Sequence, residues 1–323
     1  MSSKEKAAWC GYALILVFLF LLSSTNLILK EKKQEIYPVS VIIDDINGEY
    51  YANFRTGMDM AAENYHVDVN FITLYADNDQ EQQLELLRRE VRDGARAVVL
   101  APVNESSAVM ALEELPSGCP IVLLGSSTGN SSVACSISPD MQALGKQLAG
   151  QIVLKENPQV PVCLLTEGLA YSGNRELYDG LSMVLEEHGF LIRLVQKADE
   201  DTYRRVIEET VYPESSRILL VAMDPEALHD AADIISGSSV YREHVEALYG
   251  VGSTVAILNR LDEGVIDGLI TYNQFDEGYL GIERAVEAIQ GTAPGRREEM
   301  EAYYIEAEDL QEGTYEKLLY PMQ

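Results

Sequence analysis

Residues 67–102, VDVNFITLYADNDQEQQLELLRREVRDGARAVVLAP, contain one strand–helix–strand unit. The two apolar runs, VDVNFITL (67–74) and AVVLAP (97–102), are short and rich in Val, Ile and Leu, which is typical of strands buried on both faces. Between them, residues 79–94 place apolar side chains at helical spacing, and the closing Gly94 suits the end of a helix. The pattern predicts two parallel strands joined by a helix.

The same alternation continues on both sides of this unit and restarts at a predicted helix over residues 139–157. The other predicted strands cover residues 39–44, 120–125, 162–168, 190–196, 217–224, 246–252 and 268–273. Two successive sets of strands and helices indicate an α/β protein with two doubly wound parallel-sheet lobes. In such sheets, ligands bind beyond the carboxyl ends of the strands, so the loops there are the candidate site.

The N-terminal stretch 8–29, AWCGYALILVFLFLLSSTNLIL, contains no charged residue. At ~1.5 Å per residue, a helix of this length crosses a bilayer core of about 30 Å. A cleavable signal peptide is the alternative, although no clear small-x-small cleavage site follows the apolar run. We expect an uncleaved signal-anchor helix after a cytoplasmic segment 1–7, with residues 30–36 as a linker. Lysines on both sides leave its orientation open on charge alone.

The composition argues against several classes of partner. With 24 Lys+Arg against 52 Asp+Glu, the formal net charge is −28, so nucleic acid and anionic lipid surfaces should repel the chain. No pair of the four cysteines has C-x-x-C spacing, and the four histidines are scattered, so no metal and no cofactor is expected. Cys119 and Cys135 either form a disulfide bridge or are buried as small apolar residues.

No signature of a P-loop enzyme, a serine hydrolase or a zinc protease occurs in the chain. The loop after the first strand does contain candidate ligand contacts, because Tyr50 and Tyr51 follow an amide and two acids. These tyrosines either stack on a ligand ring or pack at the start of a helix. Asp44, Asp45 and Glu49 also permit an acid–base enzyme, for which no nucleophile or metal set is present.

Several segments resemble the ribose- and galactose-type binding proteins, which are type I periplasmic-binding proteins. The first-lobe segments are DINGEYYANFRTGMDMAAENY and YADNDQEQQLELLRREVRDGARAVVLAPVNESSAV. SISPDMQALGKQLAGQIV is similar to the crossover into the second lobe, EGLAYSGNRELYDGL to the R-x-x-x-x-G loop, and LITYNQFDEGYLGIERAVEAIQG to the return. The resemblance covers roughly residues 37–310 and implies a two-lobed clamp that binds a small polar ligand without catalysis.

The resemblance also implies which residues bind the ligand. They are Asn47, Tyr50, Tyr51, Ser126, Arg175, Asp224, Tyr272 and Asn273. The two tyrosines would stack on the ligand, and Arg175 would donate hydrogen bonds to its oxygens. The alternative for Arg175 is a surface salt bridge with Glu176 or Asp179. The alternative for Asp224 is to cap the following helix.

Two departures from the family pattern bear on the ligand. Sugar binders of this family carry Asp-Arg after the fourth strand, where this chain has Gly125-Ser126. A second family carboxylate falls on Gly252. Because both acids are missing, the ligand expected is a sugar, a sugar-like molecule or another polar metabolite.

The expected lobes comprise residues 37–139 plus 273–302 and residues 140–272 plus 303–323. The chain is expected to pass between them near Ser138–Pro139, Tyr272–Asn273 and Ala302–Tyr303, and these crossings would form the hinge.

The expected function is that of a single-pass, membrane-anchored binding protein whose binding domain lies outside the cytoplasm. Its partner would be an ABC permease or a sensor kinase. The alternatives are a secreted sugar-binding component of an ABC importer with a cleaved signal and, in a different class, a glycan-acting enzyme. A DNA-binding repressor of the lactose type is excluded, because residues 1–34 are hydrophobic and contain no helix-turn-helix.

Overall fold

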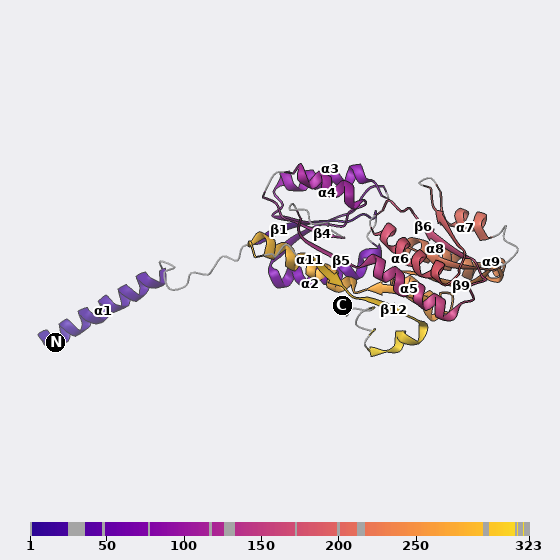
Figure 1. The fold of residues 1–323 in the computed structure, drawn as a ribbon. Helices are drawn as coiled ribbons and strands as arrows, with labels where there is room; N and C mark the ends of the chain where they lie inside the picture. The colour runs from indigo at the N-terminus through magenta and orange to yellow at the C-terminus, as the bar shows by residue number, and fades with distance from the viewer. Residues whose placement is uncertain are drawn as a thin grey trace. The chain divides into compact units, whose positions relative to one another are not determined.

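The computed structural model describes residues 2–24, 36–46, 49–76, 78–115, 118–125, 133–171, 173–198, 201–211, 217–292, 297–313, 315 and 319. The chain divides into two units, Met1–Ile36 and Tyr37–Gln323, each described here by itself. The first unit contains helix α1 (Ser3–Ser24), drawn in Figure 1. Most of its apolar side chains are exposed. Its segment Ser3–Leu22 is long and apolar enough to cross a membrane, judged by length and composition only. The helix begins earlier than the expected span 8–29, whose last residues lie outside the described part.

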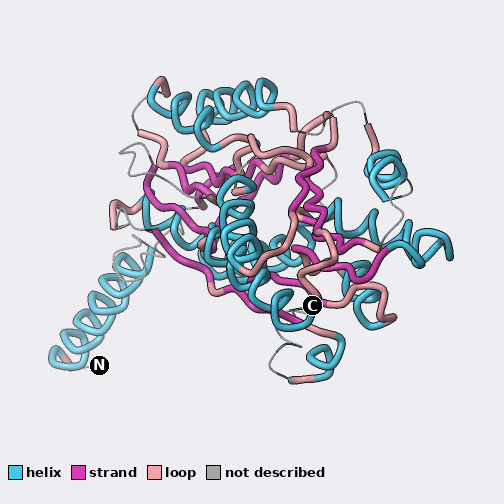
Figure 2. The backbone as a smooth tube through the Cα atoms, turned by 45° about the vertical axis from the view of Figure 1, so that its right-hand side comes forward, coloured by secondary structure: helices cyan, strands magenta, loops and turns pink. Residues whose placement is uncertain are grey.

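The second unit contains two six-stranded sheets, as expected for a two-lobed α/β protein. The first sheet has the order β11-β5-β4-β3-β1-β2, and its pairings are parallel. Its strands are β1 (Tyr37–Ile42), β2 (Val67–Ile72), β3 (Ala97–Leu100), β4 (Ile121–Leu124), β5 (Val133–Pro139) and β11 (Arg297–Met300). Figure 2 shows the strands at the centre of the unit with the helices around them.

The second sheet has the order β12-β10-β9-β8-β6-β7. Its strands are β6 (Val162–Thr166), β7 (Ile192–Gln196), β8 (Ile218–Ala222), β9 (Val245–Val251), β10 (Gly268–Tyr272) and β12 (Ala302–Ile305). The edge strand β12 runs antiparallel to β10, whereas the other pairings are parallel.

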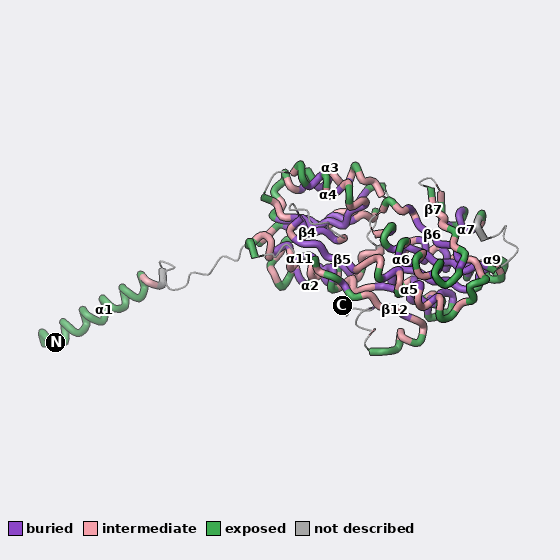
Figure 3. Tube along the Cα trace, viewed as in Figure 1, coloured by how far each residue is buried: buried purple, intermediate pink, exposed green. Residues whose placement is uncertain are grey.

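Helices cover both faces of each sheet. In the first lobe they are α2 (Ala52–Tyr65), α3 (Gln80–Asp93), α4 (Glu105–Glu113) and α11 (Gln274–Ile289). In the second lobe they are α5 (Met141–Lys155), α6 (Asn174–Glu187), α7 (Tyr203–Val211), α8 (Pro225–Gly237), α9 (Ser239–His244) and α10 (Val255–Asp262). Short 3₁₀ turns occupy Glu49–Tyr51 and Ala307–Gln311. Figure 3 shows the strands buried and the outer sides of the helices exposed.

Successive residues of β1 show why the inner strands are mostly apolar. Val41 packs into the cluster formed with α2 and α11, whereas Ile42 packs into the cluster on the opposite face, formed with α3 and α4. Neighbouring side chains of a strand point to opposite faces, so burial on both faces removes the polar alternation of a half-exposed sheet.

The chain passes between the two sheets three times. β5 of the first sheet leads into α5 through Asp140, β10 of the second sheet leads into α11 through Asn273, and Glu301 joins β11 to β12. We propose these three short connections as the hinge between the lobes. Tyr272, at the end of β10, packs against core clusters of both lobes.

All four cysteines are free, so the disulfide considered for Cys119 and Cys135 is not formed. The two side chains pack on opposite faces of the first sheet, Cys135 in the cluster with α2 and α11 and Cys119 against the cluster with α3 and α4. They therefore act as small apolar residues, which was the alternative considered from the sequence.

The close contact between α2 and α11 depends on two glycines. A Cβ added at Gly57 would lie 1.9 Å from the carbonyl oxygen of Phe275, and one added at Gly278 would lie 2.0 Å from the carbonyl oxygen of Phe54. Each glycine thus faces the backbone of the other helix, which no side-chain rearrangement can move away. The return of the chain into the first lobe therefore requires glycine at both positions.

We expect Gly57→Ala to lower the free energy of unfolding by roughly 1–3 kcal/mol or more, because α2 and α11 must move apart to admit the methyl group. Gly150→Ala in the middle of α5 is the matched control, since a Cβ there meets nothing within 4 Å. Alanine favours a helix over glycine by up to about 1 kcal/mol, so the control should be equally or more stable. Urea unfolding measures both; equal stability of the two variants would contradict the proposed contact.

Candidate functional site

A cavity of about 370 Å³ is lined by residues of both lobes. Its wall includes residues at or just beyond the carboxyl ends of strands in both sheets. They are Asp44 after β1, Ala101 after β3, Gly125 after β4, Ser138 in β5, Glu167 after β6, Asp224 after β8, Gly252 after β9 and Tyr272 in β10. Strand ends from two sheets thus converge on one space, in the position where open α/β sheets bind ligands.

The first-lobe wall holds two carboxyl groups, each bound by a tyrosine hydroxyl. Tyr51 donates to Oδ1 of Asp44 at 2.7 Å, and Tyr272 donates to the carboxyl group of Glu277 in the first turn of α11. Glu277 is only 5% exposed. Burial raises the pKa of Glu277 to about 8, and the nearby charge of Asp44 adds to the effect. Burial also raises the pKa of Asp44 to about 6.

The second-lobe wall holds a further pair of acids. Burial and, to a smaller extent, the charge of Asp224 together raise the pKa of Glu167 to about 8. Asp224 accepts hydrogen bonds from the backbone N–H groups of Ala227 (2.8 Å) and Glu167 (3.1 Å) and from the hydroxyl of Tyr203 (3.0 Å). Burial raises the pKa of Asp224 as well, and these donors oppose the rise. Asp224 thus caps α8 and also lines the cavity.

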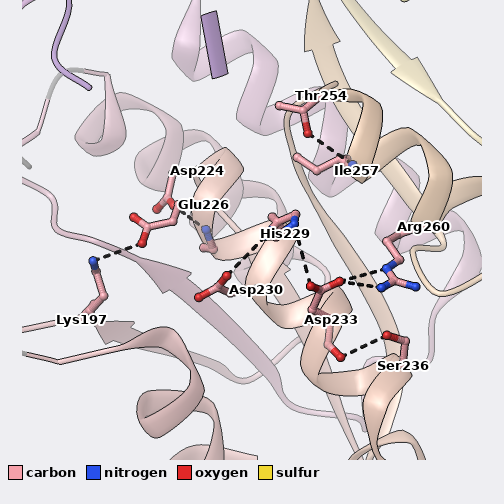
Figure 4. Close-up of polar contacts among 11 residues, drawn as sticks. Lys197, Asp224, Glu226, His229, Asp230, Asp233, Ser236, Thr254, Ile257 and Arg260 are labelled. Carbon is pink, nitrogen blue, oxygen red and sulfur yellow. Dashed lines mark hydrogen bonds and ion pairs between the residues drawn. The ribbon is translucent and has the colours of Figure 1, made fainter. Parts of the chain in front are cut away.

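Acidic side chains dominate the charge of the cavity. The lining acids are Asp44, Asp45, Glu105, Glu167, Asp224, Glu226 and Glu277. No lysine, arginine or histidine belongs to the lining among the described residues. The cation near this wall is Lys197, whose Nζ lies 3.6 Å from Oε1 of Glu226 (Figure 4).

Four of the eight residues expected from the sequence line the cavity: Tyr50, Tyr51, Asp224 and Tyr272. Asn47 and Ser126 lie outside the described residues. Asn273 is not part of the lining and caps α11, accepting from the backbone N–H of Asp276 at 3.1 Å. Arg175 is exposed and does not line the cavity either.

The start of α6 explains the position of Arg175. The helix begins at Asn174, which is 6% exposed, lines the cavity, and donates from Nδ2 to Oγ1 of Thr166 and to the carbonyl oxygen of Gly168. Adjacent helical residues point about 100° apart. Because Asn174 points inward, Arg175 points to solvent.

Glu167, Glu277, Ser138 and Asn174 line the cavity but were not predicted as ligand contacts. Glu167 lies near the end of the predicted strand 162–168 and directly after the observed strand β6, so its place at a strand end was a usable signal. Glu277 lies in the first turn of a helix, where acids occur for electrostatic reasons alone, so its sequence position gave no such signal. The hydroxyl of Ser138, a residue 4% exposed, has no hydrogen-bond partner among the described residues.

Gly252 lines the cavity where the family pattern has a carboxylate. Its φ of 135° lies in a region that side chains with a Cβ rarely adopt. An added Cβ would lie 3.0 Å from a side-chain carbon of Ile257 and 3.1 Å from Cβ of Pro225. The backbone of the loop after β9 therefore requires glycine at position 252. This requirement explains why no carboxylate occurs there.

The arrangement can accept and donate hydrogen bonds and can present tyrosine rings to a ligand. Among the described residues, no group of three or more His, Cys, Asp or Glu side chains could hold a metal ion.

The buried acids predict how stability depends on pH. Between pH 4.5, the usual pKa of a glutamic acid, and about 8, folded Glu277 holds a proton that the unfolded chain has released. Stability should therefore fall as the pH rises through this window, by at most about 1.4 kcal/mol per pH unit for each proton. Glu277→Gln cannot titrate and keeps an oxygen that accepts from Tyr272, so its curve should be shallower.

Urea unfolding from pH 5 to 8 measures this dependence, and Glu187→Gln, at an exposed position of α6, is the control. The control should reproduce the slope of the unchanged protein. Parallel curves for the protein and Glu277→Gln would show that Glu277 does not titrate in this range.

Comparison with known proteins adds a family and a set of similar folds. None of the curated proteins matches the chain. A solute-binding protein from Agrobacterium vitis, bound with α-D-tagatopyranose, has a TM-score of 0.80 at 14% identity, over 88% of this chain and 100% of that one. A solute-binding protein from Bacillus halodurans with bound myo-inositol has a TM-score of 0.73 at 19% identity, over 87% and 98%.

A chain of the XylFII–LytSN complex has a TM-score of 0.74 at 14% identity, over 85% of this chain and 99% of that one. These likenesses confirm the expected two-lobed fold. The sequence profile described as "periplasmic binding protein domain" matches residues 39–293, most of the chain and nearly all of both lobes. With the α/β lobes and the cavity at their strand ends, this match shows that the chain belongs to the periplasmic binding protein domain family.

Proposed function

We propose that this chain is a membrane-anchored, extracytoplasmic solute-binding protein that closes on a small polar ligand, a sugar or a sugar-like molecule. The observation that carries the proposal is the cavity formed by the carboxyl ends of strands from both sheets. A ligand there would touch both lobes at once. Contacts from both sides favour the closed arrangement by the difference in affinity between the closed and open states.

Among the described residues, hydrogen bonds join the lobes outside the three connections, and one of them runs from Nδ2 of Asn53 to the carbonyl oxygen of Leu319 at 3.2 Å. Nδ2 of Asn78 donates to Oε2 of Glu167 at 2.8 Å, and Nδ2 of Asn104 donates to the carbonyl oxygen of Ala170 at 2.6 Å. Tyr171 of the second lobe also packs against the first-lobe core. The hydrogen bonds among these contacts can be exchanged with water, which suits lobes that separate to admit a ligand and meet again around it.

The chemistry of the wall supports a hydroxylated ligand. Carboxyl groups exchange hydrogen bonds with hydroxyl groups, and tyrosine rings pack against the apolar face of a sugar ring. Similar folds hold α-D-tagatopyranose and myo-inositol. The role proposed is binding without catalysis, so a purified sample should leave any bound sugar unchanged.

The partner would be an ABC permease or a sensor kinase. Helix α1 would keep the binding domain at the membrane beside either one. The similar fold in the XylFII–LytSN complex binds a second protein, which favours a direct protein partner. Recovery of the tagged full chain from its native membrane, with its bound proteins identified by mass, separates the two roles.

Tyr272→Ala should weaken binding of any sugar that the protein binds by about tenfold or more, because the ring both lines the cavity and packs between the lobes. Arg175→Ala should leave the dissociation constant nearly unchanged, since that side chain is exposed. Calorimetric titration of both variants gives the comparison, and small-angle scattering with and without ligand reports closure. A greater loss of ligand affinity in Arg175→Ala than in Tyr272→Ala would show that Arg175 contacts the ligand.

If α1 is an anchor, the mature protein keeps it. The intact mass of the protein purified from its native membrane should correspond to a chain that still contains Ser3–Ser24. Extraction should require detergent. A soluble product that begins after this helix would instead support the secreted alternative with a cleaved signal.

A further inference from the structure

The three connections between the lobes lie at one edge of each sheet. They belong to β5 and β11, which are neighbours at an edge of the first sheet, and to β10 and β12, which are neighbours at an edge of the second. The loop that follows β6 lies near the opposite edge of the second sheet, where β6 pairs with the edge strand β7. Residues 167–171 of this loop are called the clasp below. A rotation about the proposed hinge moves the clasp further than it moves residues beside the connections.

The clasp contacts the first lobe on the side away from the hinge. Asn78 lies after β2, the edge strand opposite β11, and its Nδ2 donates to Oε2 of Glu167 at 2.8 Å. Asn104 lies after β3, and its Nδ2 donates to the carbonyl oxygen of Ala170 at 2.6 Å. Tyr171 packs against the apolar cluster formed with α3 and α4, whose other described members all belong to the first lobe. Separation of the lobes must break these contacts.

Contacts within the second lobe fix the shape of the clasp. The backbone N–H of Leu169 donates to Oε1 of Gln196 at 3.1 Å, and Nδ2 of Asn174 donates to the carbonyl oxygen of Gly168 at 3.0 Å. The backbone N–H of Asn174 donates to the carbonyl oxygen of Tyr171 at 3.2 Å. A Cβ added at Gly168 would lie 3.1 Å from a ring carbon of Tyr171, so the ring lies against the clasp's own backbone. A segment ordered in this way loses little conformational entropy when it meets the first lobe.

The clasp extends from the cavity wall to residues outside it. Glu167 and Asn78 line the cavity, whereas Asn104 and Tyr171 do not belong to the described lining. The contacts of Asn104 and Tyr171 join atoms of the chain to one another, so they stabilise the closed arrangement whether or not a ligand is bound. Their effect on binding is therefore separable from direct contact with the ligand.

We propose that residues 167–171 clasp the first lobe opposite the hinge and hold part of the ligand-free population closed, so that Tyr171 and Asn104 set ligand affinity without touching the ligand. The effect on affinity rests on the proposed function, whereas the effect on closure does not. The apparent dissociation constant equals the constant of the closed form divided by the fraction that is closed. Loss of the clasp lowers this fraction and weakens every ligand by the same factor.

Two variants remove the contacts that lie outside the cavity. Tyr171→Ala removes the packing against the first lobe. Asn104→Asp removes the Nδ2 donor but keeps the Oδ1 that accepts from the backbone N–H of Ser107 at 2.8 Å, and aspartate caps a helix as well as asparagine does. Asn104→Asp therefore tests the clasp even if Tyr171→Ala does not fold. The matched controls are Tyr75→Ala, at a side chain that is 85% exposed, and Asn259→Asp, at an exposed position of α10.

Closure is measured on the full chain without ligand, by small-angle neutron scattering in a neutral detergent whose contrast is matched by the solvent. The radius of gyration should be larger in Tyr171→Ala and in Asn104→Asp than in the unchanged protein, because more molecules are open. Both controls should give the value of the unchanged protein. An unchanged radius in every clasp variant that folds, or an equal increase in the controls, overturns the proposal.

Affinity is measured by calorimetric titration of the same proteins with a panel of neutral sugars and polyols that includes D-tagatose and myo-inositol. The clasp variants should raise the dissociation constant of each compound that binds by one common factor, about tenfold at most, and the controls should not change it. A factor that differs from one compound to another would show direct contact with the ligand and would also overturn the proposal. If no compound binds, the proposed function fails, and the scattering comparison alone decides whether the clasp exists.

Discussion

Burial of both faces of each sheet is the constraint on which the rest of the structure depends. With Val41 packed toward one pair of helices and Ile42 toward the other, a polar side chain in such a strand needs a buried partner, as Ser40 has in Glu90. The acids that line the cavity lie at strand ends, in loops and in the first turns of helices. The three connections then hold the carboxyl ends of the two sheets around one cavity. The concentration of acids there is therefore a consequence of the architecture as much as of the sequence.

Much of the fold could be predicted because buried strands have a direct sequence signal. Continuous apolar runs such as AVVL in β3 and ILLVA in β8 predicted these two strands correctly. Three strands were not predicted: β5 is VACSISP, in which serines interrupt the apolar run, β11 is REEM, an edge strand paired on one side, and β12 is AYYI, an edge strand whose residues are mostly half-buried. Edge strands need less apolar surface and therefore lack a strong apolar run in the sequence. Their position depends on pairing with a strand that is distant in the sequence, which a local pattern does not predict.

The candidate site was harder to predict than the fold, and α6 shows the reason. The spacing between Arg175 and Gly180 matched the family pattern, yet spacing does not determine where a helix begins. Because α6 begins at Asn174, that residue faces the cavity and Arg175 faces solvent. Glu277 lies more than 200 residues from Asp44 in the sequence, and their proximity comes only from the return of α11 to the first lobe. Residues directly after strands were predictable because strand ends are fixed by the sheet.

The acids of the cavity also affect the conformational balance. In the proposed closure, the lobes would remove water from Asp44, Glu167 and Glu277, whose pKa values burial raises because the charged forms lose hydration. A closed cavity without ligand would therefore be opposed by its own carboxylates unless they take up protons. A ligand that donates hydrogen bonds to these groups would offset this opposition in the closed state and have little effect on the open state, where water already solvates the acids. The same groups that would bind the ligand thereby make closure depend on it, which is the coupling that a partner protein needs in order to distinguish the loaded form from the empty one.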